Sequence, residues 1–217
     1  MKTDSDIKRD VEAELRWSPE IDETDIAVKV NGGVVALSGF ARSYYDKYQA
    51  EATVKRVAGV AGVANDVEVR LPQGGETSDP ETAREAVTAI KLALPVSHES
   101  IKVLVHKGRV TLEGTVEWQY LKEAAETAVR RLRGLTGVSN LITIRPRVST
   151  TDIQHKIEDA FRRNAEVDAK HISIEARGSE VTLRGNVRSW GEREQAQRTA
   201  WSAPGVTQVK NQITVGP

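Results

Sequence analysis

Cysteine is absent from this 217-residue sequence, and aromatic residues make up only 5% of it. The lack of cysteine excludes disulfides, thiolate catalysis and cysteine-based metal sites. No apolar run approaches the roughly 20 residues that a membrane-spanning helix needs. The 31 basic residues balance 31 acidic ones, so no whole-molecule field attracts nucleic acid. We therefore expect a globular chain with no nucleic-acid partner.

We also expect neither a targeting segment nor a catalytic site. The first ten residues, MKTDSDIKRD, lack the apolar stretch of a secretory signal and are too acidic for a transit peptide, so we expect a cytoplasmic protein, attached at most peripherally to the inner membrane. None of the four histidines has metal-ligand spacing with another, and no G-x-S-x-G nucleophile motif occurs. We predict no enzyme activity, no catalytic residue, no metal and no cofactor.

The sequence contains three copies of one repeat unit. Shifts of 75 and 146 residues align residues 7–69 with 82–144 and 153–215 without a gap, and we place the modules at residues 4–71, 79–146 and 150–216. We call each set of residues aligned across the three copies a column, and the columns with one residue type throughout suit turn or core roles. Those with glycine or asparagine are Gly39, Gly114 and Gly185, then Gly59, Gly134 and Gly205, then Asn65, Asn140 and Asn211.

Periodicity predicts the elements of each unit. Ile7, Val11 and Leu15 share one face of a helix, and residues 26–30 and 35–37 alternate at period two, as strands do. A second helix over residues 44–57 and a third strand over 67–69 complete the order α-β-β-α-β. We predict three α+β modules, each a three-stranded mixed sheet with two helices on one face. Asp4, Asp79 and Thr150 are predicted N-caps of the first helices.

The repeated glycines and asparagines have predicted structural roles. A side chain at Gly39 is expected to obstruct the helix that follows the second strand. Gly59 has the position of a left-handed helix end. Asn65 precedes the third strand, where its side chain can bond nearby backbone; the alternative is that its carbonyl oxygen helps to coordinate an ion.

The paired motifs resemble the BON domain, named for bacterial osmotically inducible and nodulation proteins. They read VALSG and GVAGVAN in the first copy, VTLEG and GLTGVSN in the second, and VTLRG and GVTQVKN in the third. The resemblance implies a bacterial envelope or stress protein whose modules bind phospholipid membranes or partner proteins. It also implies a possible monovalent cation, because a related type that joins a BON domain to a LysM domain binds potassium.

Two groups of side chains are candidates for such binding. Five arginines, Arg130, Arg131, Arg133, Arg145 and Arg147, are candidate lipid contacts; the alternative is a solvated helix end that complements the dipole. Six aromatic residues near the second helices, Tyr44, Tyr45, Trp118, Tyr120, Trp190 and Trp201, are candidate partner or membrane contacts, and packing between modules is the alternative.

These observations favour a non-enzymatic stress-response or envelope-associated protein that binds anionic phospholipid through linked weak sites. A cytoplasmic potassium-sensing module and a protein-interaction scaffold remain the alternatives. The arrangement of the modules and the oligomeric state stay open.

Overall fold

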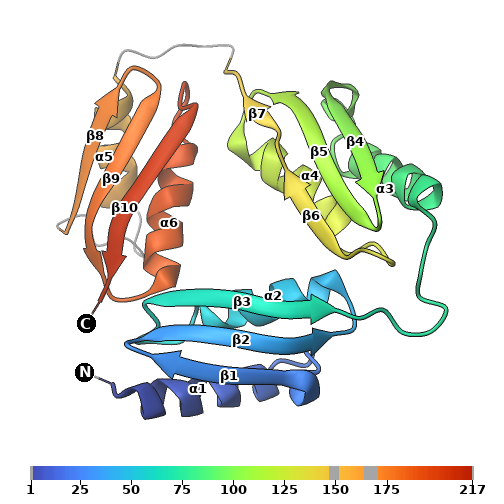
Figure 1. Ribbon diagram of the computed structural model, residues 1–217. Coiled ribbons are helices and arrows are strands. Elements are labelled where there is room, and N and C mark those ends of the chain that lie inside the picture. The colour runs from blue at the N-terminus through green and yellow to red at the C-terminus, as the bar shows by residue number, and fades with distance from the viewer. Residues whose placement is uncertain (1, 147–151, 164–170, 217) are drawn as a thin grey trace.

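The computed structural model describes residues 2–146, 152–163 and 171–216, and in it the α-β-β-α-β order occurs three times (Figure 1). Module 1 comprises α1 (Asp4–Trp17), β1 (Ile26–Asn31), β2 (Val34–Ala41), α2 (Tyr44–Val54) and β3 (Gly62–Val69). Module 2 comprises α3 (Asp79–Ala93), β4 (Ile101–His106), β5 (Arg109–Val116), α4 (Gln119–Arg130), β6 (Gly137–Asn140) and β7 (Thr143–Ile144). Module 3 comprises α5 (Ile153–Arg163), β8 (Ile172–Arg177), β9 (Glu180–Val187), α6 (Trp190–Trp201) and β10 (Gln208–Val215).

Each sheet is mixed, as predicted. In module 1, β1 and β2 form an antiparallel hairpin and β3 adds in parallel to β2, giving the order β1-β2-β3. Module 3 repeats this order as β8-β9-β10. In module 2 the third strand has two segments, because the ladder along β5 is interrupted between β6 and β7. A parallel third strand needs a crossover, and the second helix supplies it.

The two helices of each module cover one face of its sheet. Ile7 and Val11 of α1 are buried together with Val35 of β2 and with Ala50 and Val54 of α2. Modules 2 and 3 have cores of their own built from the same columns. The period-two and period-3.6 patterns therefore identified the buried faces correctly, and the α+β prediction is confirmed.

Two of the second helices begin at serine caps, whereas the predicted caps of the first helices in modules 1 and 2 are displaced by one residue. The side chains of Ser43 and Ser189 accept from the amides of Asp46 and Glu192 and cap α2 and α6. The N-caps of α1 and α3 are Thr3 and Ser78, so the prediction that Asp4 and Asp79 are N-caps was wrong by one residue. Thr150 lies outside the described residues.

Asp4 and Asp79 instead bind the tip of the β-hairpin in their own modules. The two carboxylate oxygens of Asp4 accept from the amides of Gly32 and Gly33, at 2.8 and 2.9 Å. Asp79 accepts from Lys107 and Gly108 at the same two distances. The start of the first helix is thereby tied to a turn 28 residues further along the chain.

The structural reasons for glycine at Gly39 and Gly59 also differ from those expected. Gly39 lies within β2, paired with Ile26, at φ 114°. A β-carbon there would lie 2.0 Å from the carbonyl oxygen of Asp25, so the obstruction is the start of the first strand and not the following helix. Gly59 has the expected positive φ of 95°, but α2 has already ended at Val54, so this glycine shapes the turn after the helix.

The three modules lie around a common centre (Figure 1). The third strand of each sheet is its innermost strand, and α2, α4 and α6 lie on the side toward the centre. The chain thus brings the second helices of all three modules together.

Candidate functional site

The candidate functional surfaces are the three junctions at which the second helices meet. We call them the 1–2, 2–3 and 3–1 junctions after the modules that form them. At each junction, residues at the start of one second helix approach the end of the second helix of a neighbouring module. Six of the eight tyrosine and tryptophan residues of the sequence lie at such helix starts, which is why the junctions are rich in rings.

The 1–2 junction is built from arginine–tyrosine pairs. Arg131 Nη2 donates to the hydroxyl oxygen of Tyr45 at 2.7 Å, and its guanidinium lies 4.7 Å from the ring centroid. The Arg130 guanidinium lies 3.5 Å from the centroid of Tyr48 and forms a 2.8 Å ion pair with Glu126. Stacking of this kind contributes roughly 0.5–2 kcal/mol per pair, depending on desolvation.

Tyr44 extends the same junction into the core of module 2. Its ring packs against the apolar cluster of that module although it belongs to α2. Burial raises the pKa of its hydroxyl, and the nearby carboxylate of Glu126 raises it further. The phenol therefore stays neutral well into the alkaline range.

The 3–1 junction places a tryptophan of module 3 on module 1. Trp190 packs against the module 1 core, and Lys55 Nζ lies 5.7 Å from its ring centroid. Beside it is a cavity of about 210 Å³, whose lining includes Tyr48 and Arg56 of module 1 and Glu194 of module 3.

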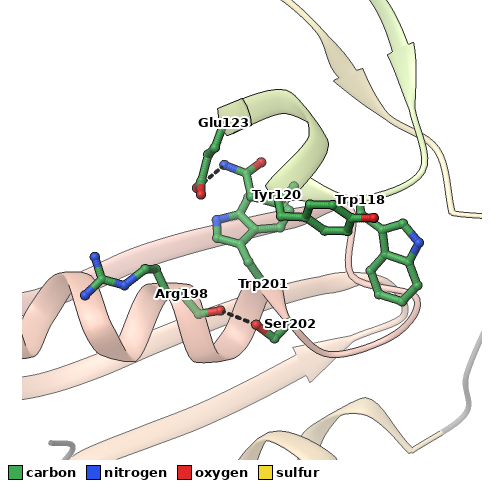
Figure 2. Close-up of a pocket in the computed structure, with 7 residues that line it drawn as sticks. Trp118, Tyr120, Glu123, Arg198, Trp201 and Ser202 are labelled. Atoms are coloured by element: carbon green, nitrogen blue, oxygen red, sulfur yellow. Dashed lines mark hydrogen bonds between the residues drawn. The ribbon is translucent and has the colours of Figure 1, made fainter. Parts of the chain in front are cut away.

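The 2–3 junction has an open cavity of about 580 Å³, larger than the one at the 3–1 junction (Figure 2). Module 2 contributes Trp118, Gln119, Tyr120 and Glu123, and module 3 contributes Arg198, Trp201 and Ser202. Trp118 and Tyr120 are 37% and 62% exposed, respectively, whereas Trp201 is half-buried against its own core. In Figure 2 the labelled rings of Trp118, Tyr120 and Trp201 lie together, and Arg198 lies apart from them along α6.

The same alignment columns meet at all three junctions. The column of Tyr45 holds Tyr120 and Gly191; that of Tyr48 holds Glu123 and Glu194; that of Lys55 holds Arg130 and Trp201; and that of Arg56 holds Arg131 and Ser202. At each junction, columns from the start of one second helix meet columns from the end of the next, so the modules are arranged head to tail. Tyr48, Lys55 and Arg198 were not among the predicted site residues. The signal was position: Lys55 shares the column of Trp201, and Tyr48 and Arg198 lie three residues from Tyr45 and Trp201 on their helices.

The predicted arginines divide into two groups. Arg130, whose side chain is 14% exposed, and Arg131 are engaged within the 1–2 junction. Arg133 and Arg145 are exposed, and Arg147 lies outside the described residues. The structure therefore does not bring the five residues together as one open basic patch within its described part, and their role in lipid binding stays a prediction.

The asparagine column fastens the third strand to the second helix. Asn140 Nδ2 donates to the carbonyl oxygen of Lys122 at 2.8 Å and to Glu126 Oε2 at 3.2 Å. Its Oδ1 accepts from the Ile142 amide at 3.3 Å. Asn65 and Asn211 make the corresponding bonds. The oxygen that the ion-binding alternative requires already has a backbone donor, and that alternative stays a prediction.

A second surface, not singled out by the sequence, lies at the ends of the first helices. Trp17 is 84% exposed, and Leu92, in the same column, is 79% exposed. The preceding column is basic in every copy, with Arg16, Lys91 and Arg162, all exposed. Comparing these adjacent columns across the repeats could have revealed the surface.

Within the described residues, no helix is both long and apolar enough to span a membrane, and no group of three or more His, Asp or Glu side chains is placed to hold a metal ion. The fold and the junctions define a class of protein built from tandem α+β modules that pack against one another through aromatic and cationic side chains.

A family model of the BON domain matches residues 3–70, 78–146 and 149–217. The chain belongs to the BON family, with three tandem domains, as its sequence motifs indicated. It is 33% identical over 141 residues to the osmotically-inducible protein Y of Escherichia coli (strain K12), a match that covers 63% of this chain and 70% of that protein.

Two solved structures of CdsD, a structural protein of the type III secretion system of Chlamydia trachomatis, are also similar. One is its C-terminal domain, at 13% identity and a TM-score of 0.27, with 100% of both chains covered. The other has 16% identity and a TM-score of 0.28, with 96% of this chain and 91% of that chain covered.

Proposed function

We propose that this protein is a non-enzymatic osmotic-stress protein that attaches peripherally to anionic phospholipid membranes. Its relation to an osmotically-inducible protein supports the stress context. The observation that carries the membrane contact is the pair of exposed apolar side chains, Trp17 and Leu92, in one repeat column beside a basic column.

This arrangement suits a lipid surface. An apolar side chain can enter the boundary between headgroups and acyl chains while a neighbouring cation pairs with phosphate. Arg16 precedes Trp17 and Lys91 precedes Leu92, so each of these helix ends has both parts. Module 3 has Arg162 and Arg163 in the two columns and supplies charge alone. Val96, 91% exposed, adds apolar surface to module 2.

The repetition of this helix end in one chain supports simultaneous attachment. Each end is a weak site. Linkage on one molecule raises their effective concentration at the surface and lets them act together.

The helix-end contact replaces part of the lipid contact predicted from the sequence, which consisted of five arginines. Arg130 and Arg131 stack on tyrosines in the 1–2 junction, and recruiting them to lipid would break those pairs. Arg133 and Arg145 are exposed and remain candidate auxiliary contacts.

Vesicle co-sedimentation tests the proposal. The full chain is expected to bind vesicles containing phosphatidylglycerol, to bind phosphatidylcholine vesicles weakly, and to dissociate as salt rises, because the cationic contribution is screened. The double substitution Trp17→Ser and Leu92→Ser should weaken binding by about tenfold or more, since two inserted apolar groups are lost.

The matched control is Leu104→Ser, which removes an apolar side chain that is 49% exposed on β4, away from the helix ends. This variant should bind like the wild type. Binding that ignores phosphatidylglycerol, or that survives the double substitution, would contradict the proposal. No binding to either vesicle would favour the protein-scaffold alternative.

A further inference from the structure

The 2–3 junction differs from the other two in lacking its cation. In the 1–2 junction, Arg130 and Arg131 lie over the rings of Tyr48 and Tyr45. In the 3–1 junction, Lys55 lies over Trp190. The columns that supply these cations hold Trp201 and Ser202 at the 2–3 junction, so no side chain from them can play that part.

The aromatic half of the 2–3 junction is nevertheless retained. Tyr120 occupies the column of Tyr45, and Trp118 and Trp201 add two further rings to the lining. The carboxylate of Glu123 lies at the same cavity, positioned by a 2.9 Å hydrogen bond from Gln119. The cavity of about 580 Å³ falls within the range of roughly 300–1,000 Å³ typical of small-molecule sites.

We propose that this cavity binds a small organic zwitterion that carries an alkylated ammonium group and a carboxylate. The negative faces of aromatic rings attract a cation, and an alkylated ammonium is weakly hydrated and contacts ring carbon at little desolvation cost. The ligand cation takes the place that an arginine or lysine side chain occupies at the other junctions.

Arg198 accounts for the carboxylate. Its column holds Ala52 and Thr127 in the other copies, so a positive charge at this helix position is particular to module 3. Arg198 Nε and Nη2 donate to Gln195 Oε1 at 3.0 and 2.7 Å, which orients the guanidinium along α6. Glu123 and Arg198 give the lining one charge of each sign, so a ligand that carries both a cation and a carboxylate matches it better than a simple cation does.

The proposal is independent of membrane attachment, because the cavity and the helix-end surface use different residues. Its test is a titration of the full chain with glycine betaine, followed by calorimetry and by tryptophan fluorescence. We expect saturable binding with a dissociation constant below about 10 mM. Choline lacks the carboxylate and should bind several-fold more weakly, and 3,3-dimethylbutanoate, which has carbon in place of the cationic nitrogen, should not bind measurably.

Two variants locate the site. Tyr120→Ala should weaken betaine binding by about tenfold, because it removes one of the aromatic rings that contact the ammonium group. Trp201→Arg places in the chain the cation that Arg130 supplies at the 1–2 junction, and should abolish betaine binding while circular dichroism shows a folded protein. Trp17→Phe, outside the cavity, is the matched control and should retain full affinity.

Osmolytes raise the stability of any protein by exclusion from its surface, so a shift in melting temperature is not the measure of binding. The proposal is overturned if betaine does not saturate the chain, if 3,3-dimethylbutanoate or choline binds equally well, or if Tyr120→Ala leaves the affinity unchanged.

Discussion

At the scale of single residues, the repeat preserves positions where backbone passes close to backbone. Gly39, Gly114 and Gly185 have φ values of 114°, 135° and 145°, in the region that favours glycine. In each case a β-carbon would lie 2.0 Å from the carbonyl oxygen of the residue before the first strand. Neither atom can move without breaking the hairpin register, so no side chain can be accommodated.

The first prediction follows from this contact. Gly39→Ala is expected to destabilise module 1 by about 3 kcal/mol or more, because strain at positive φ adds to the clash with the Asp25 carbonyl. The control is Gly32→Ala at the hairpin tip, where φ is 57° and nothing lies within 4 Å, and its cost should stay near 1 kcal/mol. Urea unfolding followed by circular dichroism compares them; equal costs would show that the close approach is not limiting.

At the scale of elements, each first helix is joined to the hairpin tip by an aspartate in modules 1 and 2. In module 2 the amides of Gly108 and Lys107 donate to Asp79 and hold the pKa of its carboxyl below its ordinary value of 3.8. The carboxylate is bound more favourably in the folded chain than in the unfolded one. Its contribution to stability is therefore present above the ordinary pKa and is lost as pH falls through the lowered folded pKa.

The second prediction concerns this pH dependence. Asp79→Ala should lower the melting temperature at about pH 6 and reduce the further loss of stability between about pH 5 and pH 2, since the titrating contact is gone. Glu113→Ala, at an exposed position of β5 in the same module, should keep the wild-type acid profile. Calorimetry across this range makes the comparison, and an unchanged slope in Asp79→Ala would refute the assignment.

At the scale of the whole molecule, three head-to-tail junctions close the chain into a ring of modules. Contacts that run head to tail and then close leave no junction surface unmatched. The 1–2 and 3–1 junctions each use a chain cation on a chain ring. Only the 2–3 junction departs from this pattern, which is why it carries the proposed ligand site.

The third prediction tests ring closure. Removing both Tyr45 and Tyr48 by alanine substitution should open the 1–2 junction and raise the radius of gyration in small-angle scattering, with module secondary structure retained. A double-mutant cycle between Tyr45 and Arg131 should give a coupling of about 1 kcal/mol. Arg145→Ala, at an exposed position after β7, should leave both measurements unchanged. A zero coupling energy would show that the pair does not hold the modules together.

The sequence by itself determined the module. Alternation along the strands, helical spacing at Ile7, Val11 and Leu15, and gap-free repetition specified the α+β class and the triplication, because burial on one face imposes a local period that neighbouring residues share. The same reasoning misassigned Asp4 and Asp79. An acid at a helix start can either cap the helix or accept from a distant turn, and the amides that these carboxylates bind lie 28 residues further along the chain.

Only the tertiary structure decided how the modules meet. The Arg131–Tyr45 hydrogen bond spans 86 residues, and no periodicity links such distant positions. The columns involved also differ between copies: Arg130 and Lys55 are cations, whereas Trp201 is not. Each contact depends on shape and charge presented by two separately folded surfaces, so the ring, and the cavity at its 2–3 junction, exist only once the modules have folded and packed.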